Sequence, residues 1–254
     1  ADFLRPEVRR WFGRQYKVLL DAGVEGFWND MNEPAIFYTP EHLAQVIDAI
    51  GSFKGRKMDL EDYFSFKNLS GSLSNSMQDY ASFYHEVKGQ KVRHDRIHNL
   101  YGYNMTRAAS EAFAELRPNH RTLIFSRASC IGAHRYGGIW LGDNNAWWSH
   151  LLQNLRQMPG VQMSGFLFSG ADLSGFGCDT TPDLVLRWLE FGIFTPLMRN
   201  HSALGTRNQE YYRFPEHLDA IRKMLQLRYA LLPYLYSEFV KAALSDGMYF
   251  RPLA

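Results

Sequence analysis

Cysteine is scarce in this sequence, since only Cys130 and Cys178 occur among 254 residues. A disulfide-stabilised scaffold is thereby excluded, and two thiols favour a reducing compartment, so we expect a cytoplasmic protein. An excess of one charge is also lacking, because 28 Lys and Arg balance 26 Asp and Glu. We therefore expect neither nucleic acid nor a membrane surface as a partner. No apolar run approaches the roughly 20 residues that a membrane helix needs.

The chain alternates amphipathic helical segments with short apolar segments that end in polar residues. We predict helices at 6–22, 98–116, 145–157, 181–190 and 215–243. We predict strands at 24–30, 121–129, 137–144, 164–172 and 191–201. This alternation predicts an α/β fold with a parallel sheet, and polar groups at successive strand ends favour a (β/α)8 TIM barrel. Five strands are predicted, whereas such a barrel has eight, so either three strands are unrecognised or this chain is the second part of a barrel that starts upstream, and we prefer the second explanation.

Two stretches depart from the alternation. Residues 38–97 contain the runs GSFKGRKMD and NLSGSLSNS and are too long for an idle connection. An inserted subdomain or lid over the functional site is therefore expected there. Residues 246–254, which end in GMYFRPLA, have strand-like character, and we interpret them as the entry to a following β domain.

Two runs that carry carboxylates follow predicted strands: WNDMNEP at 28–34 and WLGDN at 140–144. Taken singly, either run is explained by helix capping or by loop-end hydrogen bonding through Asp and Asn. Strand ends converge in a barrel, however, so both runs are expected to face one substrate. Two carboxylates flanked by tryptophans suit glycoside hydrolysis, in which one attacks the sugar and the other protonates the leaving oxygen. These residue types do not choose between Asp30 and Glu33 as the attacking group.

The same two runs resemble signatures of glycoside hydrolase family 31. WNDMNEP is similar to the family's nucleophile motif, and WLGDN is similar to its acid/base segment. The resemblance implies that Asp30 is the nucleophile and that Asp143 is the general acid/base. It also implies a barrel whose fourth strand carries the nucleophile, so this chain would hold strands four to eight, with the inserted subdomain after strand four.

Three further runs resemble the same family in the same order. FSRAS is similar to the segment whose Arg binds the sugar, SGADLSGF to a segment that supplies an Asp and a Phe, and MRNH to the segment whose His contacts the sugar. The substrate-binding residues that the resemblance implies are Trp28, Met31, Arg127, Trp140, Asp172, Phe176 and His201. Asp172 has an alternative role, in which it orients Arg127 through a charge-assisted hydrogen bond without touching sugar.

The resemblance implies retaining hydrolysis of terminal non-reducing α-glucosyl residues from maltose- or isomaltose-type oligosaccharides, with residues 1–254 as a portion of the catalytic barrel. Side chains supply acid, base and nucleophile, so neither metal nor organic cofactor is expected. The alternatives are an α-xylosidase, an α-galactosidase, an α-transglucosylase or an α-glucan lyase of the same family, and a non-catalytic carbohydrate-binding barrel.

The expected partners besides the oligosaccharide are the missing N-terminal part of the same protein and, as an option, further copies of the chain. We expect the isolated segment to be inactive, because a barrel without its first three strands leaves an open edge. His94 and His98 lie four residues apart in RHDRIHN and suggest a metal pair. No third ligand has suitable spacing, so a solvated or locally hydrogen-bonded pair is the preferred interpretation.

Overall fold

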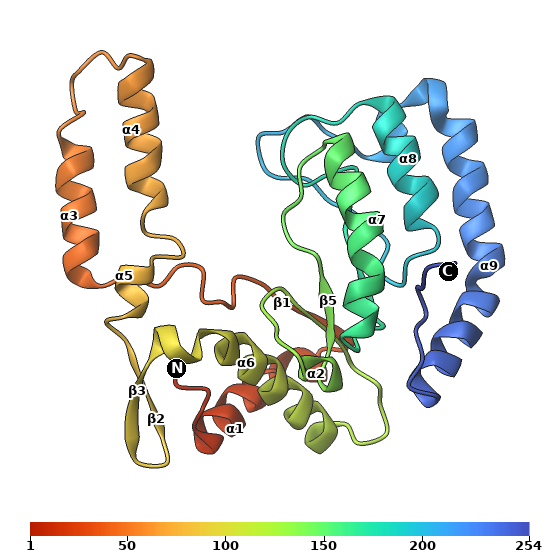
Figure 1. The fold of residues 1–254 in the computed structure, drawn as a ribbon, viewed down its shortest axis with the longest axis horizontal. Helices are drawn as coiled ribbons and strands as arrows, with labels where there is room; N and C mark the ends of the chain where they lie inside the picture. The colour runs from red at the N-terminus through yellow and green to blue at the C-terminus, as the bar shows by residue number, and fades with distance from the viewer. Residues whose placement is uncertain (254) are drawn as a thin grey trace. The chain divides into compact units, whose positions relative to one another are not determined.

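The computed structural model describes residues 1–253, which divide into two compact units, Ala1–Cys130 (unit 1) and the residues from Ile131 onward (unit 2). Parallel strands and helices build both units (Figure 1). The strand pairs β1–β4, β5–β6 and β7–β8 are all parallel. The predicted α/β class with a parallel sheet is therefore confirmed.

Unit 1 begins with a helix pair and contains the insertion. Its elements are α1 (Pro6–Gln15), α2 (Lys17–Asp21), β1 (Gly26–Asn29), α3 (Pro40–Gly51), α4 (Leu60–Gly71), α5 (Met77–Tyr80), β2 (Tyr84–Val87), β3 (Gln90–Arg93), α6 (His94–Leu116) and β4 (Leu123–Ser126). The predicted helix at 6–22 is thus two helices, which separate at Tyr16. The predicted strands at 24–30 and 121–129 correspond to β1 and β4, whose register places Trp28 opposite Phe125.

Helix α1 packs very closely against α6. A Cβ atom at Gly13 would lie 2.4 Å from the carbonyl oxygen of Ala108 and 2.6 Å from the Cβ of Ala112, so only glycine allows this approach. Beneath the contact, Leu20 and Phe113 belong to a buried apolar cluster with Ile124 of β4. This cluster fixes the strand pair against α6, because burial of large apolar side chains provides most of the local stabilisation.

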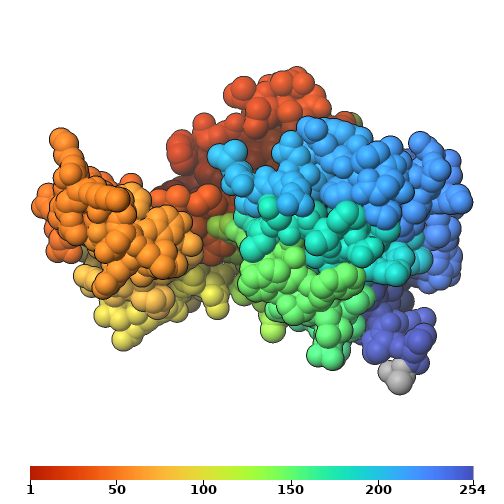
Figure 2. Space-filling model, turned by 90° about the horizontal axis from the view of Figure 1, so that it is seen from above, coloured from red at the N-terminus to blue at the C-terminus, as the bar shows by residue number. Residues whose placement is uncertain are grey.

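The insertion predicted at 38–97 folds into helices α3, α4 and α5 and the β2–β3 hairpin. Thr39 caps α3 by accepting a hydrogen bond from His42 N at 3.1 Å, and Asp59 and Asp62 form a reciprocal capping box at the start of α4. None of the residues of α4 is buried. Figure 2 looks down on the α3–α4 pair, whose orange atoms are exposed in that view. The predicted role of this segment as a lid stays a prediction.

Unit 2 carries the remaining elements. They are η1 (Ala133–Arg135), β5 (Gly138–Trp140), α7 (Trp148–Met163), β6 (Ser169–Gly170), β7 (Asp172–Leu173), α8 (Pro182–Gly192), β8 (Arg199–Asn200), η2 (Tyr211–Arg213), η3 (Pro215–His217) and α9 (Leu218–Leu244). Trp188 of α8 is fully buried in a cluster with Leu173 and Met158, which joins α8 to β7 and α7.

Two of the predicted strands are much shorter than expected. Within 164–172 only β6 and the start of β7 are strand, and within 191–201 only β8 is. The reason is that turns, bends and irregular backbone occupy 164–168 and 193–198, and that α8 itself continues to Gly192. Gln162 stabilises the end of α7, because its buried side-chain amide donates to the carbonyl oxygens of Phe166 at 2.8 Å and Leu167 at 3.1 Å.

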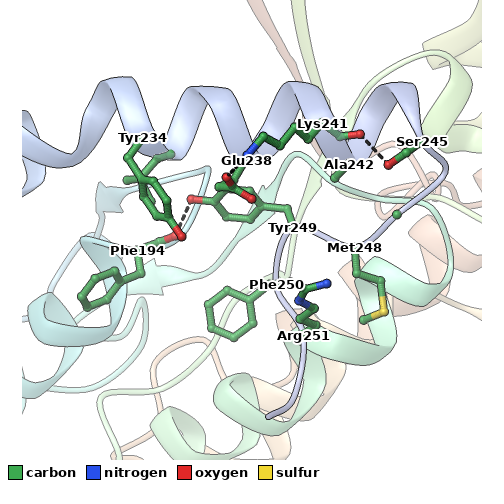
Figure 3. Close-up of a pocket in the computed structure, with 12 residues that line it drawn as sticks. Phe194, Tyr234, Glu238, Lys241, Ala242, Ser245, Met248, Tyr249, Phe250 and Arg251 are labelled. Carbon is green, nitrogen blue, oxygen red and sulfur yellow. Dashed lines mark hydrogen bonds and ion pairs between the residues drawn. The ribbon is translucent and has the colours of Figure 1, made fainter. Parts of the chain in front are cut away.

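The segment after α9 runs back along unit 2 without forming a strand over residues 246–253. The backbone N–H groups of Tyr249 and Phe250 donate to Gln162 Oε1 at 3.2 and 3.3 Å. Together with Phe194 and α9 this segment lines a hollow of about 430 Å³ (Figure 3). None of the predicted site residues lines it. The interpretation of 246–254 as the entry to a β domain stays a prediction, and residue 254 lies outside the described range.

Three smaller expectations concern membranes, metals and thiols. No helix within residues 1–253 has the length and apolar character needed to cross a membrane. The same residues contain no group of three or more His, Cys, Asp or Glu side chains that could hold a metal ion. His94 Nε2 and His98 Nδ1 instead lie 2.9 Å apart in a hydrogen bond, as the preferred interpretation expected. Cys130 and Cys178 are free.

Gly102 of α6 provides a test of how tightly the loops after β1 and β4 are packed. A Cβ atom there would lie 2.6 Å from the Cβ of Ala128 and 2.8 Å from the carbonyl oxygen of Asn32. Gly102→Ala should therefore lower the free energy of unfolding by about 1–3 kcal/mol, as overpacking does. Gly51→Ala, which meets no atom within 4 Å in α3, should be neutral or stabilise by up to about 1 kcal/mol. Denaturant unfolding of both variants checks this, and equal stabilities would contradict the close packing.

Candidate active site

The loop that follows β1 carries Asp30 at its surface. The Asp30 side chain is 52% exposed, and its Oδ1 accepts a hydrogen bond from the backbone N–H of Met31 at 2.6 Å. Met31 has a φ of 53°, which turns the chain sharply directly after the carboxylate. The turn leaves Oδ2 of Asp30 without a hydrogen bond to any of the described residues.

Arg127, which follows β4, binds both carboxylates of this loop. Its Nε and Nη2 donate to Glu33 Oε1 and Oε2 at 2.8 and 3.1 Å, a bidentate pair, and its Nη1 lies 3.2 Å from Asp30 Oδ1. Both oxygens of Glu33 are thus engaged, whereas Asp30 keeps one for a ligand. The geometry therefore favours Asp30 over Glu33 as the reacting group, a choice that the residue types alone left open.

Asn32 joins the two loops beneath this clamp. Its side chain is buried; Nδ2 donates to Ser126 Oγ at 2.9 Å, and Oδ1 accepts from the backbone N–H of Ala128 at 3.0 Å. Nearby, Tyr16 donates its hydroxyl hydrogen to Asn29 Oδ1 at 2.8 Å, and burial raises the pKa of Tyr16 to about 12, so this donor stays protonated. These bonds hold the ends of β1 and β4 in one arrangement.

Two of the predicted sugar-contacting residues lie beside Asp30 in unit 1. Trp28 packs its ring against Phe125 with the ring centroids 4.9 Å apart, and Met31 is 43% exposed directly after the carboxylate. Trp28 is half-buried, so part of its surface remains accessible. An aromatic face and a flexible thioether next to a carboxylate suit the apolar side of a sugar ring.

Asp143 belongs to unit 2, where it follows β5 and is exposed. Gly142 before it has a φ of 81°, a conformation that a side chain would disfavour. The next residue, Asn144, is buried: its Nδ2 donates to the carbonyl oxygen of Asp172 at 3.0 Å, and its own carbonyl accepts from Phe176 N at 2.7 Å. Asn144 therefore fixes the backbone beside Asp143 to the loop that follows β7.

Asp172 is completely buried at the start of β7, and the side chain that binds it in unit 2 is Arg199. The Arg199 Nη2 donates to Asp172 Oδ1, and its guanidinium carbon lies 5.8 Å from the centre of the buried Trp140 ring. Burial raises the pKa of Asp172, and the charge of Arg199 opposes that rise. The carboxylate thus orients Arg199, and the role suggested for Asp172 toward Arg127 stays a prediction.

Phe176 and His201 stack on each other, with ring centroids 5.0 Å apart and an angle of 29° between the rings. Gln209, which is buried, holds the loops that carry them. Its Nε2 lies 3.1 Å from the carbonyl oxygen of Gly175, 3.0 Å from that of His201 and 2.9 Å from Asn200 Oδ1. The stacked pair is therefore held by backbone contacts on both sides.

The predicted site residues thus form one group in each unit. Unit 1 brings Trp28, Asp30, Met31 and Arg127 together, and unit 2 brings Trp140, Asp143, Asp172, Phe176 and His201 together. Sequence reasoning missed Arg199 and Gln209 as residues that position others. Arg199 lies inside the quoted run MRNH, so its signal was available, whereas nothing local to Gln209 marks it.

Residues 1–238 match the family model described as the glycosyl hydrolases family 31 TIM-barrel domain. The chain belongs to glycosyl hydrolase family 31. It is 33% identical over 253 residues to Alpha-glucosidase 2 of Bacillus thermoamyloliquefaciens, a match that covers 99% of this chain and 28% of that protein. It is 32% identical to a probable glucan 1,3-alpha-glucosidase of Oryza sativa subsp. japonica, over 99% of this chain and 24% of that protein.

Solved structures agree with this family 31 membership. The family 31 alpha-glucosidase from Bacteroides thetaiotaomicron superposes with a TM-score of 0.71 at 32% identity, over 98% of this chain and 34% of that one. A Flavobacterium johnsoniae GH31 dextranase complexed with glucose superposes with a TM-score of 0.72 at 29% identity, over 95% and 26%. The predicted TIM-barrel class is confirmed, and the chain spans about a quarter to a third of the length of these proteins.

Gln209 offers a test of how the stacked pair is held. Gln209→Leu keeps a similar volume but removes the amide donors, so we expect the free energy of unfolding to fall by about 2–4 kcal/mol. Gln153→Leu on the exposed face of α7 is the matched control and should change stability by less than about 0.5 kcal/mol. Thermal denaturation followed by circular dichroism compares the two. If both variants melt at the same temperature, the Gln209 contacts do not stabilise these loops.

Proposed function

We propose that the protein is a retaining α-glucosidase, which removes terminal non-reducing α-glucosyl residues from oligosaccharides. One observation carries the proposal: Arg127 engages both oxygens of Glu33 and one of Asp30, and leaves Oδ2 of the exposed Asp30 open to a ligand. An exposed carboxylate oriented in this way is suited to attack an anomeric carbon. The family membership and the names of the relatives support the same activity.

In the proposed mechanism, Asp30 Oδ2 attacks the anomeric carbon while Asp143, in its acid form, protonates the departing glycosidic oxygen. The covalent glycosyl–enzyme is then hydrolysed by a water that Asp143 deprotonates, which gives net retention. Arg127 holds the non-attacking oxygen of Asp30 throughout, and the charge-assisted contact fixes the direction of the attacking lone pair. Side chains provide nucleophile, acid and base, so the mechanism requires no cofactor.

Residues of unit 2 are proposed to bind the sugar in the cleaved subsite. Phe176 and His201 offer a stacked pair of rings, and His201 lines a hollow of about 410 Å³ with Ser202 and Glu210. Aromatic faces accept the C–H side of a pyranose, and the imidazole can hydrogen-bond a hydroxyl. The solved GH31 dextranase with isomaltotriose and the relatives named as glucosidases favour α-glucosyl oligosaccharides as the substrate class.

Asp30→Ala should reduce kcat on an aryl α-glucoside by about a thousandfold or more, because the covalent intermediate can no longer form. Added azide should restore turnover of this variant and give the β-glucosyl azide, since azide attacks from the face that Asp30 vacates. Glu33→Gln is the contrasting variant: it should lower activity by loosening Arg127, without azide rescue. Product anomers are read by NMR. Rescue of Glu33→Gln instead of Asp30→Ala would reverse the assignment.

Asp143→Ala should keep activity on substrates with good leaving groups, because these need no protonation. Azide should then yield the α-glucosyl azide, the opposite anomer from that of Asp30→Ala, because the covalent intermediate still forms first. Loss of activity on all leaving groups alike would contradict an acid/base role.

A panel of aryl α-glucoside, α-xyloside and α-galactoside distinguishes the proposed specificity from the alternatives within the family, and we expect kcat/KM to be highest for the α-glucoside.

A further inference from the structure

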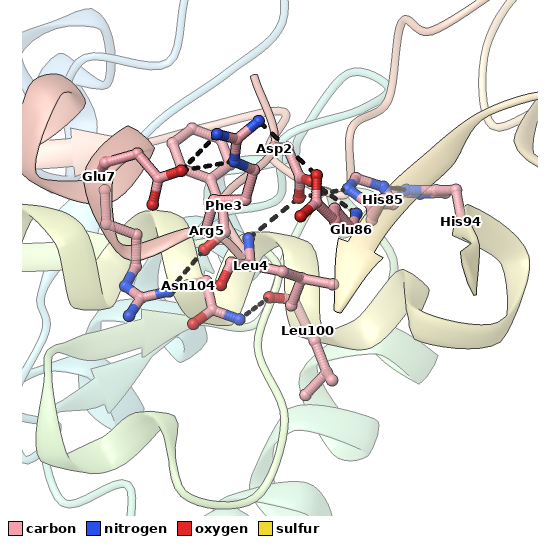
Figure 4. Close-up of polar contacts among 11 residues, drawn as sticks. Asp2, Phe3, Leu4, Arg5, Glu7, His85, Glu86, His94, Leu100 and Asn104 are labelled. Atoms are coloured by element: carbon pink, nitrogen blue, oxygen red, sulfur yellow. Dashed lines mark hydrogen bonds and ion pairs between the residues drawn. The ribbon is translucent and has the colours of Figure 1, made fainter. Parts of the chain in front are cut away.

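Three imidazole rings in unit 1 are hydrogen-bonded end to end, and a carboxylate closes one end. Asp2 Oδ1 lies 2.9 Å from His85 Nδ1, His85 Nε2 lies 2.8 Å from His94 Nδ1, and His94 Nε2 lies 2.9 Å from His98 Nδ1. Figure 4 shows the first two of these contacts. Asp2, His85, His94 and His98 are called the histidine wire below. Its centre excludes water, because His94 is completely buried and His85 is 5% exposed.

The carboxylate determines the direction of every hydrogen bond in the wire. Asp2 accepts hydrogen bonds from Leu4 N at 3.2 Å and Glu86 N at 2.8 Å. Although burial opposes it, these backbone donors and His85 lower the pKa of Asp2, so the group is an acceptor only. His85 therefore donates from Nδ1. A neutral imidazole has one donor and one acceptor, so His85 Nε2 accepts from His94 Nδ1, and His94 Nε2 accepts from His98 Nδ1.

The outer end of the wire lies beside the loop of the candidate nucleophile. The rings of Tyr80 and His98 are 4.7 Å apart, and the Tyr80 hydroxyl donates to the carbonyl oxygen of Pro34 at 2.7 Å. The negative charge of Glu33 acts on His98, whose pKa is lowered mainly by burial. His98 Nε2 is the last acceptor of the wire. It therefore lies in the electrostatic field of Glu33, the carboxylate that Arg127 binds.

We propose that the histidine wire positions the loop from Asp30 to Pro34, called the nucleophile loop below. At neutral pH the outer nitrogen of the wire, His98 Nε2, carries no N–H, so Arg127 binds the Glu33 carboxylate without a competing donor. An N–H or a positive charge at His98 would compete with Arg127 for Glu33, and the guanidinium would lose its fixed orientation toward Asp30. His98 is thus a positioning residue for the active site, and Asp2 controls it through two further histidines.

Uptake of one proton reverses the donor and acceptor roles in the hydrogen bonds between the three imidazoles. A proton that binds His98 Nε2 makes that ring a cation, which passes its Nδ1 proton to His94 Nε2. His94 passes its own Nδ1 proton to His85 Nε2. The net result is one added proton, with the positive charge on His85 beside Asp2 and an N–H on the outward nitrogen of His98. His85 Nδ1 lies 2.9 Å from Asp2 Oδ1, so the relayed charge ends beside a carboxylate.

Charged and titratable groups from all neighbouring elements contribute to this equilibrium. They are Arg5 of the N-terminal segment, Tyr80 of α5, Glu86 of β2, Arg93 of β3, Asp95 and Tyr101 of α6, and Glu33 of the nucleophile loop. Burial, together with the charges of His85 and His98, lowers the pKa of His94 to about 4, which supports the neutral form of the central ring at pH 7.

Neutron diffraction of the complete, deuterated protein tests the direction of the wire. At pD 7 we expect a deuteron on Nδ1, and none on Nε2, of His85, His94 and His98. In crystals at acidic pD we expect deuterons on Nε2 of His94 and His98 and on both nitrogens of His85. A deuteron on Nε2 of any of the three rings at pD 7 would overturn the proposal, and so would an unchanged pattern at the pD where activity is lost.

Asp2→Asn tests the link to catalysis, an effect that rests on the proposed function. An asparagine amide can donate to His85 Nδ1 as well as accept from it, so the wire is free to reverse at neutral pH without proton uptake. The kcat/KM at neutral pH should therefore fall by about twofold or more, and the acid limb of the profile should change its position. Asp95→Asn removes an equal charge next to His94, but one that is bound to Arg93, and should move the limb much less. Asp2→Glu should restore the original profile.

The outcomes separate the two proposals. Equal acid limbs for Asp2→Asn and Asp95→Asn would overturn the link between the wire and the active site. If Asp2→Asn does not fold, the diffraction maps of the unaltered protein still decide the direction of the wire. A protein that hydrolyses no α-glucoside would overturn the proposed function and leave those maps decisive, whereas hydrolysis by a protein whose maps differ would overturn the wire alone.

Discussion

Where two parallel strands end side by side, the backbone N–H and C=O groups beyond the strand ends lose their partners in the sheet. The loops that follow must provide hydrogen-bond partners for these groups. In unit 1 the buried side chain of Asn32 performs this task for two loops at once, with one hydrogen bond to Ser126 and one from Ala128. Gly102 allows α6 to approach the same two loops without a side chain between them. The placement of every reactive group in this unit depends on these contacts, because Asp30 and Arg127 lie on the loops that they join.

A carboxylate can orient a neighbouring side chain, or it can react with a substrate. The two acidic residues of the nucleophile loop differ in which of these roles their contacts allow. Glu33 uses both oxygens on Arg127, so it contributes orientation. Asp30 shares one oxygen with the same guanidinium and stays half exposed. Unit 2 repeats the division: buried Asp172 binds Arg199, while Asp143 stays at the surface. In each unit one carboxylate thus binds an arginine while the other is solvent-exposed.

The pattern of apolar runs that end in polar residues was enough to predict the α/β class and the parallel pairing of the strands. The residue types do not distinguish Asp30 from Glu33, since both are acidic residues of one loop, and it is the family motif and the Arg127 contacts that favour Asp30. The start of β6 could not be bounded from sequence, because Gln162 also accepts hydrogen bonds from the distant backbone N–H groups of Tyr249 and Phe250. Likewise the spacing of His94 and His98 was visible, but Asp2 and His85 join them only through the fold.

Helix α4 differs from every element discussed above, because it begins at a strong capping box and yet buries none of its residues. Its outward positions, including Tyr63 and Phe64, contribute almost nothing to the core and remain about half exposed. Natural selection for a folded barrel therefore acts only weakly on them. Substitutions at these exposed positions of α4 should therefore accumulate readily. An aromatic residue that is nevertheless retained there in related sequences would indicate selection for a property other than fold stability.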